Sequence, residues 1–139
     1  MPTQGASPIY VPPLFNGLGA AAPVMETKTA TFTATAADSG KIFLIVGATA
    51  AVTVTLPAIN TGPFHFTIVH LSDVDLTVAA ATADTLYTYN VAGDADSIAF
   101  STSSEKVGGT VEVFCDGVVI AALARIASSY QNVTVNDSD

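Results

Sequence analysis

The chain has 139 residues and a mass of 14.1 kDa, which is enough for one domain with a core of its own. Its 12 acidic residues outnumber the 4 basic ones, and the formal net charge of -8 repels nucleic-acid phosphates, which argues against nucleic-acid binding. Only 12% of the residues are charged, against about 25% in typical soluble domains, so we expect much of the surface to be buried in an assembly.

Residues 1–25 differ in composition from the rest and are predicted to form an extended arm. Prolines and glycines are dense enough there to prevent both a helix and a regular sheet ladder. A solvated linker would be more polar, so we expect the arm to lie on its own domain or on a neighbouring subunit, and the sequence leaves both open. The side chains expected to make capsid or inter-subunit contacts are Ile9, Tyr10, Val11, Leu14 and Phe15.

Residues 26–139 are predicted to form a single β-domain, because apolar side chains recur with a period of two between frequent turn residues. This pattern predicts an all-β fold, either an antiparallel β-sandwich or a small jelly-roll-like barrel. The expected strands are 27–36, 41–46, 52–56, 64–70, 74–79, 86–89, 97–101, 110–115 and 118–124.

Near its end the chain has a predicted hairpin turn, followed by a stretch that could be a strand or a helix. Asp116-Gly117 predicts a two-residue turn of type I′ between the last two expected strands. The stretch 119–127 is rich in alanine, so the sequence favours a strand there but leaves a helix open.

The stretch Asp38-Ser39-Gly40-Lys41 contains the Gly-Lys pair of a phosphate-binding loop. A Walker A loop has a second glycine five residues before this pair, where Thr35 stands here, and it follows a strand and opens a helix. In this chain the apolar strand comes after the glycine. The four residues therefore predict a turn and not a nucleotide site.

The two histidines and the single cysteine do not form a site in the sequence. His65 and His70 are five positions apart, which places them on opposite faces of one strand, so they are not expected to share a metal. Cys115 has no partner for an intrachain disulfide and is expected to be a small buried residue at the end of a strand.

Two pairs of aspartates lie in short polar stretches. Asp73 with Asp75, and Asp94 with Asp96, could offer oxygen ligands to calcium, but neither pair continues into an EF-hand loop. We expect solvated turn residues. The sequence also lacks a Gly-x-Ser-x-Gly motif, so it predicts no enzyme, no cofactor, no metal and no small-molecule substrate.

No targeting or membrane segment is expected. The first residues lack a basic region followed by an apolar one, and the longest run of low polarity, residues 42–52, is too short to span a bilayer. The chain is therefore expected to be made in a cytoplasm.

Several stretches resemble a module of tailed bacteriophages. They are "ADSGKIFLIV", "VTVTLPA", "FHFTIVH", "ADSIAFS" and "VGGTVEVFCDG", and the resemblance covers about residues 28–124. The module is similar to small head decoration (cement) proteins, and related modules occur in tail-fibre and appendage proteins. In one departure, Val118, Val119 and Ile120 follow the Asp-Gly turn, where the family has an aromatic residue, often tryptophan.

The resemblance implies a structural protein of the virion with no enzymatic activity. It implies a homotrimer, synthesised in the host cytoplasm, that sits on the outer capsid surface. There it stabilises the capsid by bridging copies of the phage major capsid protein against the pressure of packaged DNA. The expected partners are other copies of the chain and the major capsid protein, with no membrane and no nucleic acid.

Two alternatives stay open. A tail-fibre, appendage or receptor-binding module would contact the host through its outer loops, and Tyr87 with Tyr89 is the one suggestive aromatic pair, although cross-strand packing also explains it. A ligand-binding barrel or lectin-like domain would need a concave polar pocket, to which nothing in the sequence points.

Overall fold

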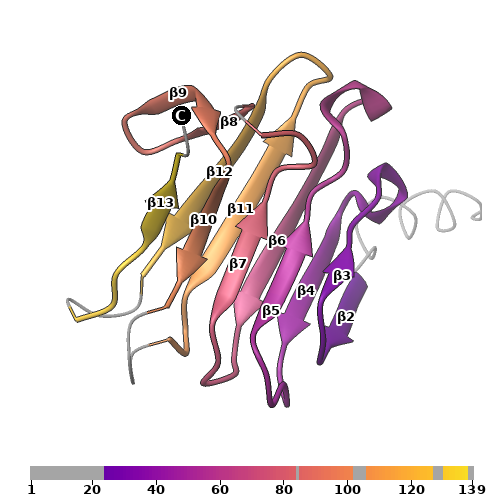
Figure 1. Cartoon of the computed structure of the whole chain (residues 1–139). Coiled ribbons are helices and arrows are strands. Elements are labelled where there is room, and N and C mark those ends of the chain that lie inside the picture. The colour runs from indigo at the N-terminus through magenta and orange to yellow at the C-terminus, as the bar shows by residue number, and fades with distance from the viewer. Residues whose placement is uncertain (1–23, 84, 102–105, 127–129, 138–139) are drawn as a thin grey trace, which may run out of the picture.

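The computed structural model describes residues 24–83, 85–101, 106–126 and 130–137. These residues form a β-sandwich of two sheets (Figure 1). The predicted all-β sandwich is confirmed, and the described strands do not close into a barrel. The predicted contact residues of the arm lie outside the described residues: Ile9, Tyr10, Val11, Leu14 and Phe15.

The larger sheet has the described strand order β2-β4-β6-β11-β12-β8-β9. Its strands are β2 (Val24–Lys28), β4 (Lys41–Ile45), β6 (Phe64–His70), β11 (Thr110–Cys115), β12 (Ile120–Arg125), β8 (Leu86–Thr88) and β9 (Val91–Ala95). The smaller sheet has the order β13-β10-β7-β5-β3. Its strands are β13 (Thr134–Asn136), β10 (Ser97–Phe100), β7 (Leu76–Ala79), β5 (Val52–Thr55) and β3 (Phe32–Thr33).

The first six strands alternate between the two sheets along the chain, and this makes their neighbours parallel. β2, β4 and β6 pair in parallel in the larger sheet, and β3, β5 and β7 do so in the smaller one. Parallel neighbours need a crossover of the chain, and here a strand of the opposite sheet supplies it in place of a helix. The later pairings are antiparallel apart from β8 with β12. The sheets are thus mixed, where the sequence predicted antiparallel pairing.

The core lies between the sheets and follows the predicted alternation. Every second residue of β5, β6, β7 and β11 is buried. The largest fully buried side chains include Phe43 and Phe66 from the larger sheet and Phe100 and Leu76 from the smaller one. The ring of Phe43 lies 5.6 Å from that of Phe66 in an edge-on arrangement, a favourable geometry for aromatic pairs.

The predicted strand 27–36 is wrong. β2 ends at Lys28, the chain crosses to the smaller sheet, β3 covers Phe32–Thr33, and a short 3-10 turn, η1 (Ala36–Asp38), follows. Ala34 is buried between two exposed threonines, so the alternation itself persists. Strict alternation predicts on which face of a strand each side chain lies. It does not predict to which of the two sheets the strand belongs.

The turn between β11 and β12 also differs from its prediction. Cys115 pairs with Ile120, so four residues connect the strands in place of two. The Asp116 carboxylate accepts hydrogen bonds from the backbone N–H of Val119, at 2.7 Å, and of Val118, at 2.8 Å, and these bonds lower the pKa of Asp116. Gly117 has a φ of 95°. The stretch after this turn is strand β12, which decides the strand-or-helix ambiguity for residues 120–125.

Candidate functional site

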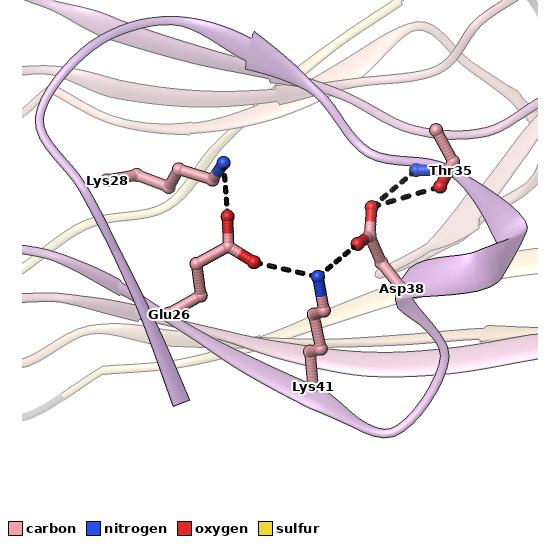
Figure 2. A network of polar contacts seen from close by, with 5 residues as sticks. All are labelled: Glu26, Lys28, Thr35, Asp38 and Lys41. Carbon is pink, nitrogen blue, oxygen red and sulfur yellow. Dashed lines mark hydrogen bonds and ion pairs between the residues drawn. The ribbon is translucent and has the colours of Figure 1, made fainter. Parts of the chain in front are cut away.

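The stretch that resembled a phosphate loop forms a network of ion pairs (Figure 2). The Lys41 ammonium lies 2.6 Å from the Asp38 carboxylate and 2.7 Å from that of Glu26, which also pairs with Lys28 at 2.6 Å. The other oxygen of Asp38 accepts from the backbone N–H of Thr35 at 2.8 Å. The ammonium is therefore engaged by two carboxylates, as the turn interpretation requires.

These contacts explain the pKa shifts in the network. Hydrogen bonds from Lys28 and Lys41 lower the pKa of Glu26. Partial burial opposes ionisation of Asp38, but hydrogen bonds from Lys41 and Thr35 outweigh it and lower its pKa. Hydrogen bonds to Asp38 and Glu26 raise the pKa of Lys41. The network joins β2 to the start of β4 and is structural in character.

The two histidines lie on opposite faces of β6, as predicted. His65 is exposed, and its ring stacks on that of Phe114 with 4.9 Å between centroids. His70 is fully buried, and its Nε2 donates to the Val74 carbonyl at 2.7 Å. Among the residues that the structure describes, its Nδ1 has no hydrogen-bond partner. Burial lowers the pKa of His70, against the smaller effect of the bond to Val74, so the ring is held neutral.

The other sequence candidates take ordinary structural positions. Cys115 is buried at the end of β11, as predicted. Asp75 pairs with Lys106 at 2.8 Å. Asp94 lies in strand β9, which the sequence did not predict, and not in a turn. Within the described part of the chain, no group of three or more His, Cys, Asp or Glu could hold a metal ion. No described helix has the length and apolar character needed to cross a membrane.

The most unusual feature is the outward side of the larger sheet, which we call the apolar face. Adjacent strands place large side chains side by side on it: Met25 pairs in register with Ile42, and Thr27 with Leu44, which is followed by Val69. Glu112 lies between Thr67 and Leu123 and forms an ion pair of 3.7 Å with Arg125. We define the apolar face by its apolar members: Met25, Ile42, Leu44, Val69, Tyr87, Phe114, Ala121 and Leu123.

A small residue hollows this face near the end of the sheet at which β11 turns into β12. His65, Phe114, Ala121 and Tyr87 are successive register partners across β6, β11, β12 and β8. Because Ala121 stands between two aromatic side chains, a hollow opens on each side of it. The hollow beside Phe114 has a volume of about 320 Å³ and the one beside Tyr87 about 410 Å³. Phe114, Tyr87 and Leu123 are 41%, 40% and 43% exposed.

The apolar face was not predicted from the sequence. Most of the strands that form it were predicted, but alternation was used only to assign their buried sides. The signal was present in the outward positions of two strands, where Ile42 and Leu44, and then Phe114, occupy places that a solvated sheet would fill with polar residues. An exposed patch of large apolar side chains indicates an interaction surface.

Comparisons with known proteins add no family: no protein-family model matches the sequence, and no curated protein matches it.

Proposed function

We propose that the chain is a structural protein of a phage virion, a homotrimeric decoration (cement) protein of the outer capsid surface. It bridges neighbouring copies of the major capsid protein and so stabilises the shell. The observation that carries this proposal is the apolar face, because a chain with 12% charged residues that also exposes such a face gains free energy by burying it against partners.

The sandwich suits such a role. Its inner faces form one cluster of buried residues, and the side chains of the apolar face do not belong to it. A protein that binds only the assembled shell stabilises that shell by mass action. The binding free energies of many weak contacts add up over the capsid lattice. In this proposal the arm residues Ile9, Tyr10, Val11, Leu14 and Phe15 make the capsid or inter-subunit contact.

A tail-fibre, appendage or receptor-binding module is the alternative function. Tyr87 supports it, since this side chain is exposed beside a hollow. Tyr89 gives less support, because its hydroxyl donates a hydrogen bond to the Ala124 carbonyl. Both rings are thus exposed, and only the hydroxyl of Tyr89 is bonded within its own sheet.

Two measurements test the proposal. Light scattering of the purified chain at micromolar concentration is expected to give the mass of a trimer, and a monomer would count against it. Electron microscopy of phage heads that lack this protein, before and after its addition, is expected to show new density on the outer surface at threefold positions. Heads that stay bare, or density on tails alone, would overturn capsid decoration.

A further inference from the structure

We propose that the hollow between Phe114 and Ala121 is the receptor for residues 9–15 of a neighbouring copy of this chain. The inference rests on the proposed assembly and names the segment that holds it together. The contact between subunits is separate from binding to the capsid. It can therefore be correct even if the protein does not bind a capsid.

The hollow is apolar and has few groups that would reject an apolar segment. Phe114 and Val119 are exposed side chains of its lining, Phe64 also lines it, and the small side chain of Ala121 leaves room over β12. Of its polar neighbours, the His65 ring is stacked on Phe114, and one oxygen of the Asp116 carboxylate accepts two backbone N–H groups of its own turn. An apolar side chain that packs between Phe114 and Ala121 leaves these hydrogen bonds of Asp116 intact.

The arm matches this chemistry. Residues 1–23 contain no Asp, Glu, Lys, Arg or His, so their side chains bring no charge into the hollow. Residues 9–15 carry two aromatic and three aliphatic side chains, of which Tyr10 and Phe15 have the size to lie beside the Phe114 ring in the edge-on or offset arrangement that aromatic pairs favour. The five prolines of the arm, at positions 2, 8, 12, 13 and 23, limit the conformational entropy that docking removes.

The arm enters the sandwich at the end of the sheet where the hollow lies. Val24 pairs with Lys41 at the start of β2, and the Gly40 N–H donates to the His65 carbonyl at 2.6 Å, so this end is shared with His65. The turn between β11 and β12 lies at the same end (Figure 1). From residue 24 back to residue 15 an extended chain spans up to about 30 Å. Three strand spacings from β2 to β11 amount to only about 14 Å, so the arm has reach to spare for a neighbouring subunit.

Symmetry favours the neighbour over the chain's own hollow. A cyclic trimer needs a heterologous contact, in which one patch of each subunit meets a different patch of the next. The arm begins at the β2 edge of the larger sheet, whereas the hollow lies on β6, β11 and β12. Two distinct patches on one sheet are what a closed head-to-tail ring requires.

The single cysteine of the chain makes this contact testable by disulfide formation. Cys115 lines the hollow, so Val11→Cys in the full-length chain places a second thiol on the arm. Under mild oxidation we expect most chains to run as covalent dimers and trimers on a non-reducing gel. Because Cys115 is mostly buried, the same experiment is repeated with Val11→Cys, Cys115→Ser and Val119→Cys, whose new thiol lies at the exposed rim.

Each outcome decides the inference. Covalent oligomers with either thiol pair support it. Loss of free thiols without covalent oligomers means that the arm docks on its own domain, and absence of any disulfide in both variants means that it docks elsewhere; both results overturn the proposal. The matched control carries Val11→Cys, Cys115→Ser and Thr77→Cys, with the second thiol on the outer face of the smaller sheet, and equal crosslinking there would also overturn it.

A separate measurement keeps this inference apart from the proposed function. Light scattering of the reduced variants reports assembly, and addition to phage heads reports decoration. A trimer that decorates heads but forms no disulfide in either variant refutes the arm contact alone. A monomer with an intrachain disulfide refutes both.

Discussion

The outward faces of the two sheets follow the same period of two but differ in chemistry. On the larger sheet, Met25, Leu44, Phe114 and Leu123 project outward with Glu112 and Arg125 among them. On the smaller sheet, two register rows project outward, and they consist of alanine, serine and threonine residues together with one asparagine. These rows are Thr33, Thr55, Ala79, Ser97 and Asn136, and Thr53, Thr77, Ala99 and Thr134.

The difference shows which face the fold requires and which it does not. Threonine is a good strand former whose hydroxyl is compatible with solvent, so the smaller sheet demonstrates that a stable outer face of this sandwich needs no large apolar side chain. The large side chains on the other sheet therefore need another explanation. Contact with a partner provides one, since an exposed apolar patch favours association and costs solubility.

The largest expected effect is a difference in stability loss between substitutions on the inner and the outer side of the larger sheet. Phe66→Ala removes a fully buried ring and is expected to lower the free energy of unfolding by about 3–5 kcal/mol. Phe114 faces outward on the adjacent β11, one position from the register partner of Phe66, and Phe114→Ala is expected to cost the isolated subunit about 1 kcal/mol or less. Urea unfolding at low protein concentration measures both. Equal losses would mean that the apolar face belongs to the core.

The second effect compares the two outer faces directly. Leu123→Asp places a charge at the centre of the apolar face and is expected to weaken self-association at least about tenfold, because the carboxylate must be desolvated in the interface. Thr77→Asp places the same charge on the outer face of the smaller sheet and is expected to leave association unchanged. Sedimentation over a concentration series gives both constants. If Thr77→Asp is the disruptive change, the assignment of the faces is reversed.

The third expected effect is a pH dependence of the free energy of unfolding, caused by His70 on the inner side of β6. Because burial lowers the pKa of His70, the unfolded chain binds a proton below about pH 6.5 that the folded chain does not. The free energy of unfolding should therefore be highest above that pH and fall as the pH drops through 6.5 toward 5. His70→Gln keeps a donor for the Val74 carbonyl but does not titrate, so it should flatten this slope.

The exposed histidine of the same strand is the control for that slope. His65→Gln leaves His70 and its bond to Val74 in place, so the slope that His70 causes should remain. Denaturation midpoints between pH 5 and 7.5 measure all three proteins. A slope that persists in His70→Gln and vanishes in His65→Gln would contradict the assignment.

The smallest effect is expected at the edge of the larger sheet, where the ion-pair network joins β2 to the start of β4. Lys41→Met removes the cation shared by Asp38 and Glu26, whose pKa values are lowered in the fold. Groups with a lowered pKa add stability above their usual pKa and lose it as the pH falls, so acid unfolding of the variant should begin at a slightly higher pH. At pH 7 the partly exposed pairs should contribute little. Carboxyl titration by NMR checks the direction, and unchanged pKa values of Asp38 and Glu26 would show that Lys41 is not their partner in solution.

The sequence predicted the strands best where alternation was clean and turn residues flanked it. β6 and β11 have the bounds that were predicted, between Gly62-Pro63 and a loop in one case and before Asp116-Gly117 in the other. It missed β9, because Gly93 and Asp94 resemble a turn, and β13, which is short and polar. The candidate arm residues stay a prediction, since they lie outside the described part of the chain.

Three properties could be predicted from the sequence: the all-β fold, the core-facing side of each predicted strand, and the turn at the Gly-Lys stretch. Those properties are local, because a period of two and the chemistry of turns act over a few residues. Strand pairing in the folded domain added that the first six strands alternate between the sheets, that their neighbours are parallel, and that the outward residues of β2, β4, β6, β11 and β12 share one side of the larger sheet. Alternation specifies the face of a residue but not its partner strand, so a shared surface exists only once the strands have paired.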